Sequence, residues 1–342
     1  MGWEPLVIGR KLQPKKNYPK KKFRVARLNL LFKSGPLFYA ELNFRLFFKL
    51  IFTRLDAIHS NDLDTLLACY LASWFKRKHL IYDSHEFFTE VPELLSNPFA
   101  RNLWLSIEQR IFPLLKHVTT VNQSIANEYE LRYGIRPKVV RNIANAPVGR
   151  EALPVDKPDR PFIVIMQGAG INIDRGAEEL LEAFTLLPDY IRLKIIGKGD
   201  VFATLKKMRV ELKLENQVDI IDSLPYAELM KHTAESHLGA TLDKATNPNY
   251  ALSLPNKIFD YMRAGLPIIS SSVVEVANIV NTHKCGTVLT EVEPKNIAEA
   301  ILYYANNIEN YWKTKIKVET AAKAYSWENE FNVFKEIYSN FK

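Results

Sequence analysis

The sequence predicts an α/β protein built from two doubly wound domains. Its 342 residues exceed what one hydrophobic core usually holds, and about two domains of ~150 residues are expected for this length. From residue 56 onward, short apolar or β-branched runs alternate with helical patterns, which is typical of a parallel sheet flanked by helices. Between residues 145 and 161 this periodicity stops and prolines accumulate among charges, as in a linker. We therefore expect domains at residues 1–147 and 148–325, and a C-terminal helix at 326–342 that packs back on the first domain.

Each expected domain has its own series of strands and helices. In the first, strands are predicted at residues 55–59, 79–83, 118–122 and 138–141, with helices at 62–75 and 124–133. In the second, strands are predicted at 162–167, 192–196, 218–221, 238–242 and 267–270, with helices at 176–186, 201–214, 226–233, 255–264 and 274–281. Both series are Rossmann-like, and ligands bind such open sheets at the carboxyl ends of the strands. Two such domains joined by a linker predict a central cleft.

Composition and cysteine usage exclude several classes of protein. Hydrophobic residues make up 47% and charged residues 25%, which argues against a disordered or fibrous chain. Cys69 and Cys285 lie far apart and outside any metal-ligand spacing, so neither a disulfide framework nor a zinc site is predicted. No export signal and no apolar stretch of ~18 residues is visible. We expect a cytoplasmic protein.

Positive charge is concentrated near the start of the chain, whose net charge is +8. Such a cluster binds phosphates of lipids or nucleic acid, or it forms a solvated face. Residues 38–52 are apolar and aromatic with interspersed cations, which fits a helix at a membrane interface as well as a core helix. We predict a contact with the inner face of the membrane through residues 10–52, and no nucleic-acid binding, since no reader motif accompanies the cluster. The cluster consists of Arg10, Lys11, Lys15, Lys16, Lys20, Lys21, Lys22, Arg24 and Arg27.

A glycine-rich loop follows the strand that ends at residue 167. Gly168 and Gly170 let backbone amides approach a phosphate, and Arg175 can form paired hydrogen bonds to phosphate oxygens. The spacing differs from the dinucleotide fingerprint, so an ordinary tight turn is the alternative. Gly197 and Lys198 repeat the pattern at the end of the next strand. We predict that the first loop holds a pyrophosphate.

Residues 249–267 form the most informative run. Pro255 stands where a first helical turn tolerates proline, so we expect the amides of that turn to point into the cleft beside the Lys257 ammonium. A diphosphate fits there. Asp260 lies four residues after Asn256 on roughly the same helical face, where its carboxylate would accept hydrogen bonds from ribose hydroxyls. A plain helix with a proline start and a glycine stop is the alternative.

Residues 254–267 resemble the donor-site signature of glycosyltransferase family 4 and its GT-B relatives, as do Tyr82–Glu86 and the order and spacing from Gly168 to Gly286. The resemblance covers nearly the whole chain. It implies the GT-B fold, in which two Rossmann-like domains face a central cleft, and metal-independent transfer from a UDP- or GDP-sugar with retention of anomeric configuration. No cofactor is expected. Glu86 does not suggest zinc, because the second His of a His-Glu-x-x-His motif is missing.

Carried over residue by residue, the resemblance implies roles for individual side chains. Arg175 and Lys257 hold the pyrophosphate, and Asp260 contacts the ribose. Ile221 and Leu224 face the base. The expected catalytic residues are His85, Arg175 and Lys257. The expected donor site consists of Gly168, Gly170, Arg175, Gly197, Lys198, Ile221, Leu224, Ser253, Leu254, Asn256, Lys257 and Asp260.

His85 is the expected contribution of the first domain, and the resemblance implies that it touches the donor sugar near the reacting carbon. A lone His at a strand end is otherwise more often structural. Three departures from the family pattern stand out. Leu252 takes the place of the first glutamate of Glu-x7-Glu, and the usual Arg of the phosphate loop falls at Ala169 or Gly170. Residues 2–10 resemble the second strand of the family's first domain, so we expect the chain to be truncated or wrongly started, without the first strand and helix.

The leading hypothesis is a glycosyltransferase that moves a sugar to a glycan or lipid-linked acceptor in cell-surface polysaccharide synthesis. Arg175, Lys257 and a helix N-terminus would stabilise the departing nucleotide diphosphate. Two alternatives stay open. A sugar-nucleotide epimerase needs acid/base carboxylates in the cleft that the sequence does not reveal. A catalytically degenerate GT-B scaffold or partner subunit is favoured by Leu252.

Overall fold

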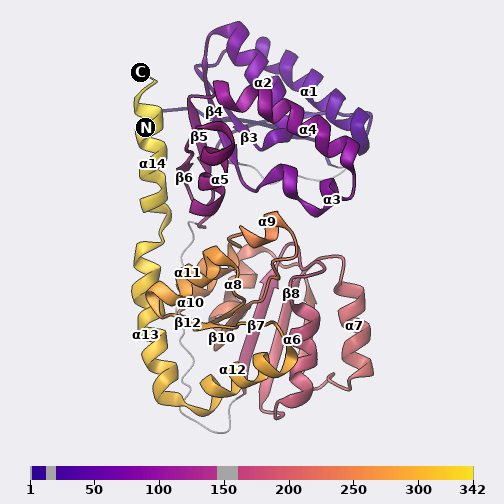
Figure 1. Cartoon of the computed structure of the whole chain (residues 1–342), viewed down its shortest axis with the longest axis vertical. Helices are drawn as coiled ribbons and strands as arrows, with labels where there is room; N and C mark the ends of the chain where they lie inside the picture. The colour runs from indigo at the N-terminus through magenta and orange to yellow at the C-terminus, as the bar shows by residue number, and fades with distance from the viewer. Residues whose placement is uncertain (1, 13–20, 145–160, 342) are drawn as a thin grey trace. The chain divides into compact units, whose positions relative to one another are not determined.

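The computed structural model describes residues 2–12, 21–144 and 161–341, and the chain divides into two compact units (Figure 1). Unit 1 contains Met1–Arg141 together with Phe331–Lys342, and unit 2 contains Asn142–Glu330. The last residues of the chain thus belong to the same unit as the first. The predicted linker at residues 145–160 lies outside the described residues.

Unit 1 is built on a parallel sheet with the strand order β3-β4-β5-β6. A separate parallel pair is formed by β1 (Leu6–Arg10), which was predicted, and β2 (Arg24–Leu28), which was not. The strands of the main sheet are β3 (Ala57–Asn61), β4 (His79–Ser84), β5 (His117–Thr120) and β6 (Lys138–Val139). The helices are α1 (Gly35–Ile51), α2 (Leu63–Lys76), α3 (Pro92–Leu95), α4 (Pro98–Ile111), α5 (Gln123–Tyr133) and the part of α14 (Trp327–Ser339) from Phe331 onward.

Unit 2 carries a parallel sheet with the strand order β12-β11-β10-β7-β8-β9. Its strands are β7 (Phe162–Gly168), β8 (Ile191–Gly197), β9 (Val218–Asp222), β10 (Leu238–Thr241), β11 (Ile268–Ser270) and β12 (Gly286–Val288). Its helices are α6 (Ala177–Ala183), α7 (Phe202–Glu211), α8 (Tyr226–Ala234), α9 (Pro248–Ala251), α10 (Lys257–Ala264), α11 (Val274–His283), α12 (Pro294–Asn306) and α13 (Ile308–Ala324).

Alternate residues of the central strand β7 pack into two different hydrophobic clusters. Val164 and Met166 join the cluster that includes residues of α6 and α12, whereas Ile165 joins the cluster that includes residues of α10 and α11. Because successive side chains of a strand point to opposite faces, helices cover both faces of the sheet, as in other parallel sheets. The predicted doubly wound α/β class is therefore confirmed.

The predicted helix at residues 38–52 is present as α1 and has two unlike faces. Phe38, Leu42, Leu46 and Leu50 recur every four residues and are buried, so this face belongs to the core, in contact with α2. The opposite face keeps aromatic side chains exposed, Phe44 among them. In the described part of the chain, no helix is long and apolar enough to cross a membrane.

Candidate functional site

Two cationic side chains contact the same buried carboxylate in unit 2. Arg175 Nη1 donates a hydrogen bond to Asp243 Oδ2 at 2.9 Å, and Lys257 Nζ lies 3.5 Å from Asp243 Oδ1. The Asp243 side chain is 2% exposed, against 21% for Arg175 and 10% for Lys257. We call Arg175, Asp243 and Lys257 the cation cluster. With both cations protonated it carries an excess of positive charge, which favours binding of an anion.

Tyr250 packs against this cluster. The Arg175 guanidinium lies 3.9 Å from the centroid of the Tyr250 ring, which is itself buried. Arg175 Nε is buried and has no hydrogen-bond partner among the described residues. Burial lowers the pKa of Lys257; Asp243 opposes this effect and Arg175 adds to it. The cluster therefore has positive charge and further hydrogen-bond donors for an anion.

The two glycine loops contact each other through their backbones. Lys198 N donates to Gly168 O at 3.2 Å, while the Lys198 side chain is exposed. Gly197 has a φ of +153°, and a Cβ at this position would lie 1.8 Å from Gly168 O. Close packing of the two loops therefore requires glycine at residue 197. A Cβ at Gly170 would have no neighbour closer than 3.8 Å, so Gly170 leaves room for a ligand.

At the start of α10, more backbone amides are hydrogen-bonded within the first turn than the sequence predicts. Ile258 N donates to Pro255 O at 3.2 Å, and Phe259 N donates to Asn256 O at 3.1 Å. Because these bonds close a tight turn, the helix begins at Lys257 rather than at Pro255. The prediction that the first-turn amides point outward is therefore wrong for Ile258 and Phe259.

The other predicted residues of this run differ in exposure. Ser253 Oγ donates to Tyr250 O at 2.9 Å, which ties it to the residue beside Arg175. Leu254 is buried in the hydrophobic cluster below α10. The Asn256 side chain is exposed and makes no capping hydrogen bond to the helix. Of these three residues, Asn256 is the one whose side chain is open to a ligand.

Asp260 is the centre of a separate network. Its Oδ1 accepts a hydrogen bond from the Tyr226 hydroxyl at 2.6 Å, and its Oδ2 accepts one from Gln167 Nε2 at 3.1 Å. Gln167 Oε1 in turn accepts from the Thr233 hydroxyl at 2.6 Å. Burial raises the pKa of Asp260, although its two hydrogen-bond partners oppose this. The carboxylate thus joins the end of β7 to α8 and α10, and each oxygen keeps one lone pair for a further donor.

Ile221 and Leu224, the residues predicted to face the base, lie at and after the end of β9. Both are partly buried and pack against the same hydrophobic cluster as Ile258. Ile221 pairs in register with Ile196 of β8. Their partial exposure leaves apolar surface at the edge of the sheet. The base contact stays a prediction.

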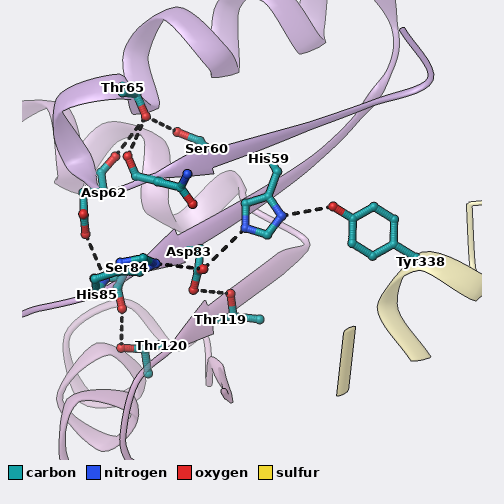
Figure 2. A network of polar contacts seen from close by, with 11 residues as sticks. His59, Ser60, Asp62, Thr65, Asp83, Ser84, His85, Thr119, Thr120 and Tyr338 are labelled. Atoms are coloured by element: carbon teal, nitrogen blue, oxygen red, sulfur yellow. Dashed lines mark hydrogen bonds and ion pairs between the residues drawn. The ribbon is translucent and has the colours of Figure 1, made fainter. Parts of the chain in front are cut away.

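In unit 1, His85 lies in a network centred on Asp83, at the end of β4 (Figure 2). Asp83 Oδ2 is 3.0 Å from His85 Nε2 and 3.4 Å from His59 Nε2, and its Oδ1 accepts from the Thr119 hydroxyl at 2.7 Å. The second ring nitrogen of His59, Nδ1, is 3.0 Å from the Tyr338 hydroxyl of α14. The His85 side chain is 39% exposed, whereas that of Asp83 is 11% exposed. His85 is therefore the more accessible of the two histidines, since the His59 side chain is 27% exposed.

The network fixes both the position and the charge of His85. The backbone amide of His85 donates to Asp62 Oδ1 at 2.8 Å. The hydrogen bond to Asp83 raises the pKa of His85, although burial opposes it. Burial would raise the pKa of Asp83, but the hydrogen bonds of His59 and His85 and the charge of His85 outweigh it, and this pKa lies well below its ordinary value. His85 is thus a positioned imidazole that favours its protonated form.

The sequence singled out Arg175, Lys257, Asp260 and His85 and missed the buried partners that hold them. It assigned no role to Asp83, Asp243, Tyr250 or Gln167. Asp243 follows β10 by two residues and thus lies at the carboxyl end of the sheet, where ligands bind. That positional signal alone points to Asp243.

Similar architecture recurs in solved structures. The chain is 17% identical to sucrose-phosphate synthase from Thermosynechococcus elongatus, with a TM-score of 0.77 over 99% of this chain and 89% of that one. It is 17% identical to Anabaena HepE in complex with UDP, with a TM-score of 0.69 over 93% of this chain and 86% of that one. It is 14% identical to a glycosyltransferase from Rickettsia africae, with a TM-score of 0.67 over 93% and 85%. The chain therefore has the GT-B fold.

Family matches cover most of the sequence. Residues 1–146 match Glycosyltransferase Family 4, and residues 153–320 match Glycosyl transferases group 1. The chain is thus a glycosyltransferase of the family 4 type. A search of curated proteins found no match.

Proposed function

We propose that this enzyme transfers a sugar from a UDP- or GDP-sugar to a glycan or lipid-linked acceptor of cell-surface polysaccharide synthesis, with retention of anomeric configuration. The cation cluster carries the proposal, because it brings Arg175 and Lys257 together on one buried carboxylate. UDP is the first nucleotide to test, since HepE, which shares the fold, was crystallised with UDP and with UDP-glucose.

Charge stabilisation of the leaving group is the proposed source of rate enhancement. Negative charge grows on the diphosphate as the bond to the sugar breaks, and Arg175 and Lys257 supply positive charge fixed in a largely buried site. The acceptor hydroxyl attacks on the same face of the sugar and gives its proton to the leaving phosphate. His85, held by Asp83, donates a hydrogen bond that orients the donor sugar.

Nucleotide binding tests the first half of the proposal. A ligand that binds only the native state raises the free energy of unfolding by about 2.7 kcal/mol at a concentration of 100 times Kd. We expect UDP or GDP to raise the melting temperature of the wild type and not that of Lys257→Ala. Lys207→Ala removes an exposed lysine of α7 and serves as the matched control. Equal nucleotide binding by wild type and Lys257→Ala contradicts the assignment.

Turnover tests the second half. Release of UDP or GDP from the corresponding nucleotide sugars, with and without candidate acceptors, is expected from an active enzyme. Nucleotide binding without any release identifies the degenerate scaffold that Leu252 favours.

A further inference from the structure

Exposed aromatic side chains gather on α1 and on the last turn of α2 in unit 1. Phe44, Phe48 and Phe52 follow one another at four-residue spacing and are 65%, 42% and 83% exposed. Their rings form a series, with centroids 4.8 Å apart for Phe44 and Phe48 and 6.3 Å apart for Phe48 and Phe52. Trp74 and Phe75 on α2 are 71% and 67% exposed. These five residues are called the aromatic surface.

The two helices that carry the aromatic surface end side by side (Figure 1). Lys76 Nζ, in the last turn of α2, donates to Ile51 O and to Thr53 O, each at 2.8 Å. Lys76 thereby caps the carboxyl end of α1. The aromatic residues of both helices therefore belong to one region of unit 1.

Cations, and few acids, surround the aromatic surface. Residues 42–55 and 65–82 contain no Asp or Glu. A hollow of about 590 Å³ lies beside the aromatic surface, lined among others by Trp74, Phe75 and three cations. Those cations are Arg77, Lys78 and Lys116; Lys49 and Arg54 are exposed near the end of α1. Lys78 lies 3.5 Å from Asp56, itself 79% exposed, so this contact is weak in water.

We infer that the aromatic surface binds an anionic phospholipid membrane. Trp and Phe insert favourably at the boundary between headgroups and acyl chains, and Lys and Arg pair with lipid phosphates. Aromatic residues and Arg are common in protein–protein interfaces too, but Lys is depleted there, and Lys49, Lys78 and Lys116 lie beside this surface, which favours a membrane. The contact changes the membrane prediction made from residues 10–52. Phe38 and its buried companions on α1 belong to the core, α2 supplies much of the contact, and part of the basic cluster lies outside the described residues.

Vesicle sedimentation with the full chain tests the inference. The vesicles contain phosphatidylcholine alone or with phosphatidylglycerol. We expect binding only to the vesicles that contain phosphatidylglycerol. Phe52→Ser/Trp74→Ser, at two strongly exposed positions, should weaken it by about 100-fold. Lys49→Glu/Arg54→Glu should weaken it by about 25-fold or more, at about fivefold for each cation removed.

Two control variants match these changes outside the aromatic surface. Leu131→Ser/Ile316→Ser removes two exposed apolar residues, 81% and 62% exposed, and Lys207→Glu/Lys313→Glu reverses two exposed lysines of unit 2. Both should bind vesicles like the wild type. The effect of UDP on the melting temperature should be the same in all variants, which separates this inference from the proposed function.

Three results would overturn the inference. The first is a wild type that does not sediment with phosphatidylglycerol vesicles. The second is an equal loss of binding in the control variants, which shows that the position of the apolar residues or of the cations does not matter. The third is a wild-type dimer in solution that Phe52→Ser/Trp74→Ser converts to a monomer, which assigns the aromatic surface to a second copy of the chain.

Discussion

Asp83 in unit 1 and Asp260 in unit 2 are equally buried, each 8% exposed as a whole residue, yet their surroundings shift their pKa values in opposite directions. Burial alone raises the pKa of a carboxyl group. Asp260 follows this rule, because burial outweighs the hydrogen bonds of Tyr226 and Gln167 and the charge of Arg263. The pKa of Asp83 is lowered instead, because it accepts hydrogen bonds from His59 and His85. The combined hydrogen bonds and charges around each carboxyl group, not the depth of burial, therefore decide the sign.

The comparison separates two kinds of chemistry in the enzyme. In unit 1, the Asp83 carboxylate favours a proton on His85, which is accessible. In unit 2, the two hydrogen-bond partners of Asp260 are neutral, whereas Asp243 contacts the two cations Arg175 and Lys257. The positive charge at the candidate site comes from a titratable histidine in unit 1 and from Arg175 and Lys257 in unit 2. Each substitution proposed below removes one of these carboxylates or the histidine.

The largest effect is expected from Asp243→Asn. The change leaves two largely buried cations without a counter-charge, which typically costs about 3 kcal/mol of unfolding free energy. Urea denaturation of variant and wild type measures the difference. The pKa of Lys257 should also fall further, because Asp243 no longer opposes the effect of burial. UDP binding should then be lost at a lower pH in the variant than in the wild type.

The matched control for Asp243 is Glu309→Gln. Glu309 pairs with Lys313 one turn away, and both side chains are exposed. Its replacement should leave the free energy of unfolding unchanged. If Asp243→Asn is as stable as Glu309→Gln, the cation cluster is not held by Asp243.

His85→Ala should reduce transfer without reducing nucleotide affinity. The imidazole is expected to contact the sugar rather than the diphosphate, so turnover should fall by about 100-fold, as when one positioned hydrogen-bond donor is removed from other active sites. Calorimetry with UDP and a transfer assay measure the two quantities separately. His232→Ala, at a histidine of α8, is the control. A loss of UDP affinity in His85→Ala, or unchanged turnover, assigns His85 a structural role only.

Local patterns in the sequence predicted most strands and helices and several site residues. Strand ends and helix starts have local signals, and for that reason His85, Arg175 and Lys257 could be singled out. Their partners depend on which elements lie side by side. Arg175 and Asp243 are 68 residues apart, and His59 and Tyr338 are 279 apart. No periodicity within one segment specifies such pairs.

Short or two-sided elements were the hardest to predict. The sequence of α1 suited both a core helix and a surface helix, and the structure shows that it is both. Strand β2 contains Arg24 and Arg27 of the basic cluster, three residues apart, so no alternation of apolar and polar residues marks it as a strand. The tight turn before Lys257 depends on hydrogen bonds to Pro255 and Asn256 that a proline alone does not specify.

Asp83→Asn should lower the pKa of His85 and remove part of the stability of unit 1. A raised pKa means that His85 stabilises the fold below its ordinary pKa of about 6.5, and that this contribution is lost as the pH rises through the folded value. Asp83, whose pKa is lowered, contributes above about pH 3.9 and loses its contribution in acid. The variant should therefore lose about 2 kcal/mol near pH 6 and less at alkaline pH. NMR titration of His85 in both proteins tests this; a midpoint that does not fall contradicts it.

The smallest expected effect concerns the ribose contact of Asp260. Its two protein partners leave one lone pair on each oxygen, so a ribose hydroxyl would add to the network rather than replace a member of it. We expect Asp260→Asn to weaken the binding of UDP more than that of 2′,3′-dideoxyuridine diphosphate, with a coupling of about 1 kcal/mol between the two changes. Calorimetry on the four combinations of protein and ligand measures this coupling. An equal loss for both ligands means that Asp260 acts only through Gln167 and Tyr226, as a neutral counterpart to the charged network of Asp83.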